Sequence, residues 1–502
     1  MLEGPNFVRW LDRGRTQDLA LARLVQRIEQ WPDRVRELPV SPRLPRAVLV
    51  ERVRAHDFSR PRDLASLVDE VADLLERGSL HATHPRYFGL FVPGVRPAGV
   101  VADGLAALYN AQLGAWWHGP AAAEIEQVTL HYLRRRIGFD TSAAAATFTT
   151  GGSEATLTAV LAALARALPR RGRAGLVGLR RPPVFYASDQ AHDSLVKVAH
   201  VTGLGRAAFR RVRSDRRQRL DPDALRRAIA RDRKAGSNPF LVVATVGTTA
   251  TGAIDPLEDL AALCRAEGLW LHADAAWGGL ALLSDTLRVH VRGLERADSV
   301  TWDAHKTLPV PMGAGMFFCR WPRFSEAAFE VHTGYVPEAE PGTADPYRKT
   351  LQWSRRFIGL KVFLTLAELG DVGITAMIDH QAAMGRLLRE ALLEGGWRVR
   401  NDSPLPLVCF TPRDAPPEAA AAIARSVAAE GAAWVSEVRL PAGERWLRAC
   451  ITHHETGPED VGALVAAVGR ARLRARRARP PSLPRATGRR LGQGPIGSAE
   501  GT

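Results

Sequence analysis

The chain has 502 residues, 46% of them hydrophobic, and a formal net charge of +15. This length and apolar content predict a large two-part enzyme fold with extensions and exclude a chain too polar to form a core. The four cysteines are widely spread and form no CxxC pair, so we expect no disulfide framework, no metal site and a cytoplasmic location. The most apolar stretch, Ala98–Trp117, is interrupted by Asp103, and the N-terminus lacks a signal peptide's apolar core, so we expect a soluble protein without a membrane partner.

The basic charge is concentrated near the C-terminus. From Arg470 onward, nine arginines stand against one acidic residue, Glu500. The stretch is rich in Pro and Gly and poor in large apolar residues, so we predict a disordered basic tail over residues 473–502. Such a tail can attract phosphate backbones, and a nucleic-acid-binding regulatory protein therefore stays open as an alternative. We favour a solvated terminus with no nucleic-acid partner, because a basic tail alone is weak evidence.

The first part of the chain predicts helices. Residues 1–95 form a helical N-terminal segment in which Leu64–Leu75 shows apolar positions at helical spacing. The segment Thr83–Gly94 is aromatic and contains Pro and Gly, which predicts a loop that lines another part of the protein rather than a helix or strand. Two further helices are predicted at Pro97–Trp117 and Ala121–Ile137.

The middle of the chain alternates short apolar runs with helical stretches. This alternation predicts an α/β fold whose large domain, residues 96–375, holds a mostly parallel seven-stranded sheet covered on both faces. Ligands bind such sheets beyond the carboxyl ends of the strands. The predicted strands are Ala146–Thr149, Val184–Ala187, Ala207–Val212, Leu241–Thr245, Leu269–His272, Ser299–Trp302 and Gly315–Cys319.

The last third predicts a second, smaller unit. Residues 321–352 look irregular, and a loop of that length is usually a lid or a linker. Two amphipathic helices, Phe357–Leu369 and Ile374–Leu393, follow. Residues 376–472 predict a smaller C-terminal α/β domain.

Several loops after predicted strands carry residues suited to chemistry. The stretch FTTGGSEAT, Phe148–Thr156, runs through a Gly-Gly turn into a helix, where Gly152 and Ser153 can cradle an anion at the positive helix end, although an ordinary N-cap would look the same. His192 can stack on a flat ring or act as an acid or base, and Asp274 at a buried strand end needs a cation or donor. Lys306, between two buried runs, is costly to desolvate unless something pairs or uses it.

Together these residues provide what pyridoxal 5′-phosphate (PLP) needs. A helix N-terminus holds the phosphate, a carboxylate pairs with the ring nitrogen, and a lysine forms the Schiff base. The ordered motifs GGSEAT, DQAH, GTT, HADAA and HK resemble the group II pyridoxal-dependent amino acid decarboxylases, which include aromatic amino acid, glutamate, histidine and sulfinoalanine decarboxylases. The resemblance extends from about Thr83 to about Asp460 and implies a type I aspartate aminotransferase-like fold, a PLP cofactor and a homodimer with sites at the subunit interface.

The resemblance also implies individual roles. Lys306, in the motif with His305, would be the Schiff-base lysine, and Asp274 would partner the ring nitrogen. His192 and Ala276 would lie against opposite faces of the ring. Gly152 and Ser153 would hold the phosphate, and Thr249 would support the ring edge. The family's loop tyrosine, which reprotonates the substrate carbon across the dimer interface, corresponds to Tyr347, with Tyr335 as second candidate.

Two positions depart from the family pattern. Asp303–Ala304 stand where many members have Asn-Pro, so Asp303 either faces the phosphate or turns away to bond the backbone. Trp277 stands where Tyr or Phe is usual and narrows the expected pocket. With Leu90, Phe91 and Val92, Trp277 favours an apolar or aromatic L-amino acid as substrate, and no arginine stands out as a carboxylate clamp. We predict decarboxylation to the amine; a carbon–carbon lyase, an aldehyde-forming decarboxylase or an aminotransferase on the same cofactor stays open.

Overall fold

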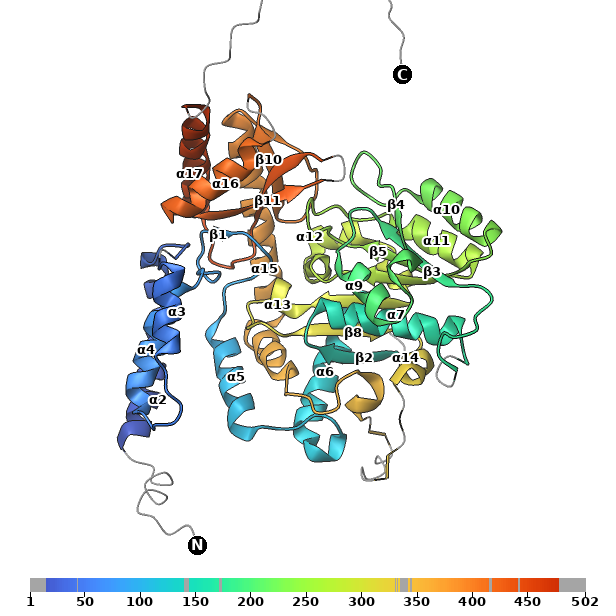
Figure 1. Cartoon of the computed structure of the whole chain (residues 1–502), viewed down its shortest axis with the longest axis horizontal. Helices are drawn as coiled ribbons and strands as arrows, with labels where there is room; N and C mark the ends of the chain where they lie inside the picture. Colours follow the sequence, from blue (N-terminus) through green and yellow to red (C-terminus); the bar gives the residue numbers. More distant parts are fainter. Residues whose placement is uncertain are drawn as a thin grey trace, which may run out of the picture.

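The computed structural model describes residues 15–42, 44–139, 144–170, 174–329, 331, 333–334, 342–343, 345–414, 418–440 and 443–477. Two β-sheets organise these residues, and Figure 1 shows the larger one beside a smaller unit that carries the C-terminal elements. None of the helices in this part of the chain is both long and apolar enough to cross a membrane.

The larger sheet has seven strands in the order β2-β8-β7-β6-β5-β3-β4. All neighbouring pairs are parallel except the two that involve β8, which runs antiparallel to both β2 and β7. Every strand predicted for this sheet is present. The strands are β2 (Ala145–Thr149), β3 (Pro183–Ser188), β4 (Phe209–Val212), β5 (Asn238–Thr245), β6 (Trp270–Asp274), β7 (Ser299–Asp303) and β8 (Gly315–Cys319).

Helices cover both faces of this sheet, so its strands are buried on both sides and read as continuous apolar runs. Alternate residues of one strand enter opposite cores: Leu241 and Val243 of β5 pack in one cluster, and Val242 in the other. The associated helices are α6 (Pro120–Ile137), α7 (Gly152–Ala167), α9 (Ser194–Val201), α10 (Pro222–Lys234), α11 (Leu257–Glu267), α12 (Asp285–Arg288), α13 (Ala304–Thr307) and α14 (Pro322–Phe329), with the 3₁₀ turns η2 (Arg206–Ala208), η3 (Gly278–Leu283), η4 (Val289–Val291) and η5 (Leu294–Arg296).

The smaller sheet combines distant parts of the chain. Its order is β1-β11-β12-β10-β9, and β1 (Tyr87–Phe88), from the segment that we assigned to the N-terminal part, pairs in parallel with β11 (Trp434–Arg439). The remaining strands, β9 (Trp397–Val399), β10 (Leu407–Pro412) and β12 (Arg445–Cys450), are antiparallel to their neighbours. Helices α16 (Ala419–Glu430) and α17 (Pro458–Arg477) pack with this sheet in one apolar cluster.

The remaining helices connect and extend these units. The helices α2 (Arg15–Glu37), α3 (Arg46–Arg54) and α4 (Leu64–Gly78) form an arm along the left of Figure 1. Helix α5 (Pro97–Tyr109) and the turn η1 (Trp116–His118) precede α6. Helix α15 (Gly359–Glu394) joins the two predicted helices across a kink at Gly370, whose φ is +58°.

Two predictions about these elements are wrong. Helix α5 ends at Tyr109 rather than Trp117, because Asn110 adopts a left-handed conformation with φ +44°. The stretch 321–352 is not irregular throughout, since it contains α14 and the turn η6 (Pro346–Lys349). Helix α17 continues to Arg477, and residues 478–502 of the predicted tail lie outside the described residues; the domain bounds stay predictions.

Candidate active site

A cavity opens where the parallel strands end, and it gathers most of the predicted site. It contains about 450 Å³ of space without atoms, part of it open to solvent. Because the carboxyl ends of β5, β6 and β7 lie on one edge of the sheet, the loops that follow them meet here. The lining includes seven of the eight predicted cofactor residues: Gly152, Ser153, His192, Thr249, Asp274, Ala276 and Lys306.

Lys306 lies on α13, a single turn that begins directly after β7. Its side chain is 28% exposed, and its Nζ lies 2.8 Å from Oδ2 of the fully buried Asp303. The Asp303 carboxylate accepts no hydrogen bond from the backbone of the described residues, so it does not turn away as one of our alternatives proposed. It faces the lysine and is the buried member of an ion pair whose ammonium group is partly exposed.

The N-terminus of α7 lies next to this ion pair. A Cβ added to Gly152 would lie 2.8 Å from the Asp303 carboxylate and 3.3 Å from Cβ of Ala276, so the backbone here approaches both side chains as closely as only glycine permits. The first N–H groups of a helix have no partner within it and attract anions. Asp303 is thus a buried carboxylate beside the position predicted for a phosphate.

Asp274 ends β6 and is 9% exposed, with its Oδ1 accepting a hydrogen bond from the Ala276 N–H at 3.1 Å. His272 lies behind it on the same strand, fully buried between Ser299 Oγ at 2.9 Å and Thr301 Oγ1 at 3.1 Å. Burial lowers the pKa of His272 to about 4, so this imidazole is neutral near pH 7. His272 therefore links β6 to β7 by hydrogen bonds near Asp274 and adds no charge to the site.

The two histidines that were predicted for the site differ in position. His192 is exposed, lies two residues before α9, and its Nδ1 accepts a hydrogen bond from the Ser194 N–H at 3.2 Å. His305 is 5% exposed and does not line the cavity; its Nδ1 accepts a hydrogen bond from the Ala314 N–H at 3.1 Å. Burial lowers the pKa of His305, which indicates a neutral ring beside the lysine.

Two aromatic side chains form one wall of the cavity. Phe91 and Trp277 stack with ring centroids 4.3 Å apart and an interplanar angle of 21°. Both were predicted to line the substrate pocket, together with Leu90 and Val92, but the last two are not in the lining and Leu90 is 53% exposed. The chain makes a tight turn here, in which the Val92 N–H donates a hydrogen bond to the Leu90 carbonyl at 2.9 Å, and Phe91 at its centre is the buried residue of the three.

Tyr347 is not at the cavity. It is 9% exposed and its ring lies against Trp353, 4.9 Å between centroids, while its N–H donates to the Gly114 carbonyl at 2.9 Å. Its predicted role as a proton donor stays a prediction. The second candidate, Tyr335, lies outside the described residues.

Several lining residues escaped the sequence analysis. Thr156, Ser194, Thr245 and Gly247 also line the cavity, and the spacing of Thr156 from Ser153 along α7 could have revealed it. An arginine near the site was also not predicted. Arg448 of β12 is 1% exposed, and its guanidinium lies 4.9 Å from the ring centroid of Phe91, on a strand whose place depends on long-range pairing.

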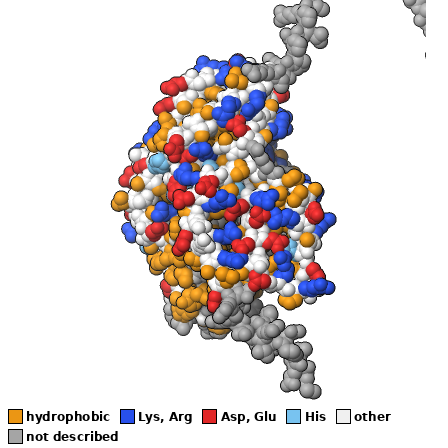
Figure 2. Space-filling view, turned by 90° about the vertical axis from the view of Figure 1, so that its left-hand side faces the viewer, with side chains coloured by type: hydrophobic (Ala, Val, Ile, Leu, Met, Phe, Trp, Pro, Cys, Tyr) orange, Lys and Arg blue, Asp and Glu red, His pale blue; other side chains and the backbone are white. Residues whose placement is uncertain are grey.

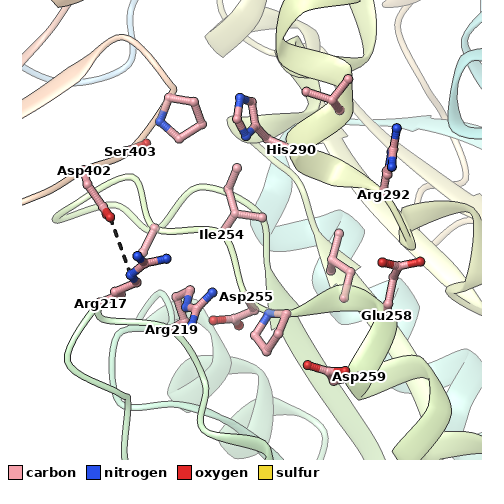
Figure 3. A pocket seen from close by; sticks show the side chains of 15 residues that line it. Arg217, Arg219, Ile254, Asp255, Glu258, Asp259, His290, Arg292, Asp402 and Ser403 are labelled. Carbon is pink, nitrogen blue, oxygen red and sulfur yellow. Dashed lines mark ion pairs between the residues drawn. The ribbon is translucent and has the colours of Figure 1, made fainter.

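A larger crevice lies elsewhere, between the loops around Arg217 and Asp255 and the segment Asp402–Pro404 (Figure 3). It lacks all of the residues predicted for chemistry. Asp255, at its base, accepts hydrogen bonds from the N–H groups of Leu220 and Thr245, both at 2.7 Å, and burial raises its pKa to about 7. This carboxyl group ties two loops together. Among the described residues, no group of His, Cys, Asp or Glu side chains is arranged to hold a metal ion.

Comparisons with known proteins agree with this geometry. A family model described as the pyridoxal-dependent decarboxylase conserved domain matches residues 51–413. An aromatic-L-amino-acid decarboxylase of Bacillus atrophaeus is 35% identical over 335 residues, covering 66% of this chain and 68% of that protein. A cysteine sulfinic acid decarboxylase of Homo sapiens is 33% identical over 377 residues, covering 70% and 75%. The crystal structure of mouse CSAD in apo form superposes with a TM-score of 0.83 at 25% identity, over 90% of this chain and 99% of that one.

Proposed function

We propose, on the premise that this chain belongs to the pyridoxal-dependent decarboxylase family, that it removes the α-carboxylate of an aromatic or apolar L-amino acid. The family, the type I fold, the PLP cofactor and amino acid decarboxylation by a carboxy-lyase are established by the comparisons above. The substrate class, the residue roles and the assembly are our inferences. The observation that supports an aromatic or apolar substrate is the stack of Phe91 on Trp277 at the cavity wall. This stack presents a flat apolar surface to the side chain of a bound amino acid.

The residues present fit PLP. The cavity supplies an amine at Lys306, a carboxylate at Asp274 and the N-terminus of α7. Two of its lining residues have buried polar atoms without hydrogen-bond partners in the described residues, Thr245 Oγ1 and Trp277 Nε1. Buried polar groups are rarely left unpaired, so these two atoms support a polar ligand at this site.

The residues that line the cavity then have distinct roles. Lys306 holds the cofactor covalently, and the amide groups that begin α7 bind its phosphate. Asp274 keeps the ring nitrogen protonated, and His192 packs on the ring face. When bound, PLP accepts the electron pair released as the bond to the carboxylate breaks. The protein would choose the reaction by orientation, since the wall of Phe91 and Trp277 would fix how the side chain of the substrate lies in the cavity.

We further propose that the enzyme is a cytoplasmic homodimer. The buried thiols of all four cysteines are unpaired, as is usual in a reducing compartment. Helix α5 exposes Val101, Leu105, Leu108 and Tyr109, whose spacing puts them on one face. Figure 2 shows hydrophobic side chains gathered low on the face that carries the N-terminal helices. Exposed apolar patches mark protein–protein contacts, and sedimentation of Leu108→Glu should give a monomer where the parent protein gives a dimer.

Carbon dioxide release by the PLP-loaded protein across the common L-amino acids tests the proposed reaction. We expect release from one or a few aromatic or apolar substrates, with the amine as product and no release from Lys306→Ala. Release chiefly from acidic amino acids would overturn the substrate class. An aldehyde or a keto acid as product would overturn the reaction in favour of one of the other chemistries that share the cofactor.

A further inference from the structure

The small C-terminal unit holds one loop of the cavity by the carbonyl groups of four consecutive residues. The Thr249 carbonyl accepts a hydrogen bond from Arg448 Nη1 at 2.7 Å, and the Ala250 carbonyl accepts one from Cys409 Sγ at 3.0 Å. The two remaining bonds of the row are Asn401 Nδ2 to the Thr251 carbonyl at 2.9 Å and Ser403 Oγ to the Gly252 carbonyl at 2.7 Å. All four donors belong to β10, β12 or the segment between β9 and β10.

The loop is arranged so that these carbonyls face outward. Its own N–H groups turn inward: Gly252 donates to the Thr248 carbonyl at 2.8 Å, and Ala253 donates to Thr248 Oγ1 at 3.0 Å. Gly252 has φ +68°, and a Cβ there would lie 2.8 Å from Ser403 Oγ. Glycine is therefore required both by the backbone conformation and by the close approach of the small unit.

The donors are themselves held in place. Asn401 Oδ1 accepts a hydrogen bond from the Cys409 N–H at 2.9 Å, and its Nδ2 also donates to the Leu407 carbonyl at 2.8 Å. Arg448 donates through Nη2 to the Gly89 carbonyl at 2.7 Å. Because these side chains are already fixed by other hydrogen bonds, they lose little further conformational entropy when they bind the loop carbonyls.

This row of bonds leads directly to the cavity. Thr249 lines it, and so do Phe91 and Trp277, the first of which lies under the Arg448 guanidinium. Figure 3 shows Asp402 pointing toward Arg217 across the neighbouring crevice, where the two form an exposed ion pair at 3.7 Å. The polar contacts between the two units thus concentrate on the loop that carries Thr249.

We propose that Asn401, Ser403, Cys409 and Arg448 are positioning residues that set Thr249 for cofactor binding, so that docking of the small unit and binding of PLP are coupled. The inference rests on the proposed role of Thr249 in the cofactor site. Coupling of this kind is reciprocal: docking of the small unit favours the cofactor, and the bound cofactor strengthens the docking.

Two matched serine-to-alanine substitutions separate an effect on cofactor binding from a general loss of folding stability. Ser403→Ala removes the donor to Gly252, whereas Ser436→Ala removes a buried hydroxyl that donates to the Arg448 carbonyl within the small sheet at 3.1 Å. Asn401→Asp keeps the shape of the side chain but replaces the amide donor by an acceptor. Three quantities are measured for each protein: amide hydrogen exchange over residues 247–253 without cofactor, the dissociation constant for PLP, and the midpoint of thermal unfolding.

For Ser403→Ala we expect faster exchange at Gly252 and Ala253 and PLP binding weakened by about 2- to 10-fold, the effect of one lost hydrogen bond. Asn401→Asp loses two, from Nδ2 to the Thr251 and Leu407 carbonyls, and should weaken PLP binding further. Ser436→Ala should lower only the unfolding midpoint. Wild-type exchange and wild-type PLP affinity in both loop variants would overturn the proposal, as would equal weakening by Ser436→Ala. Failure of the parent protein to bind PLP would instead refute the proposed function, while the exchange data on the cofactor-free protein would still report on the loop.

Discussion

Replacement of Trp277 by phenylalanine separates packing from recognition at the cavity wall. The indole is 3% exposed and stacks on Phe91 at 4.3 Å. A phenyl ring keeps that stack and removes roughly 40 Å³ of side chain, which at about 24 cal/mol per Å³ corresponds to a loss of about 1 kcal/mol. The Nε1 atom has no hydrogen-bond partner among the described residues, so its loss adds little cost in the cofactor-free protein. Trp277→Ala, by contrast, should cost about 3–5 kcal/mol.

Urea unfolding of the cofactor-free proteins measures this difference, and steady-state kinetics measure the second effect. If the indole N–H meets the bound substrate or cofactor, Trp277→Phe should raise KM or the PLP dissociation constant by about 2- to 10-fold, as expected for one hydrogen bond. A loss of stability as large in Trp277→Phe as in Trp277→Ala would refute the packing argument. Unchanged binding of both substrate and cofactor would refute a recognition role for the indole N–H.

Three further substitutions follow from buried ionisable groups. Asp303→Asn removes the carboxylate beside the start of α7, and because like charges repel more strongly in a partly buried site than in water, PLP should gain about tenfold in affinity relative to unphosphorylated pyridoxal; an unchanged ratio in fluorescence titrations would contradict this. The pKa of His272 is about 4 when folded and near 6.5 when unfolded, so the unfolded state binds more protons between these values and stability falls as pH falls, by about 3 kcal/mol at pH 4. In His272→Asn, the free energy of unfolding in urea should therefore fall less between pH 7 and pH 4.5 than in the parent protein. An equal fall in both proteins would contradict this assignment. Glu126→Ala leaves Arg355 unpaired where both side chains are 2% exposed, and it should cost about 3–5 kcal/mol; a loss below about 1 kcal/mol would show that the pair is not needed.

The large sheet could be predicted because its signals are local. A parallel strand covered on both faces must be apolar throughout, as in Leu241–Thr245, and the residues that end such strands share one edge. The order of strands and loops along the chain was therefore enough to predict that Asp274 and Lys306 lie near one another, and both line the same cavity. The residue roles drawn from the family resemblance stay predictions.

The rest depended on contacts that sequence spacing does not encode. Arg448 sits beside Phe91 because β12 pairs with β10 and β11, and Tyr87–Phe88 joins the small sheet by pairing with a strand more than 300 residues away in the chain. The end of α5 escaped prediction because Asn110, rather than glycine, takes the left-handed conformation. Leu90 and Val92 were expected beside Phe91, but only one side of that short segment faces inward.

We propose that Lys306 carries the cofactor. Borohydride reduction of the PLP-loaded protein, followed by mass mapping of its peptides, identifies the lysine that binds PLP. We predict one pyridoxyl group per chain, on the peptide that contains Lys306, and none after reduction of Lys306→Ala. A label on another lysine, such as the buried Lys361, or equal labelling of the variant, would contradict the account.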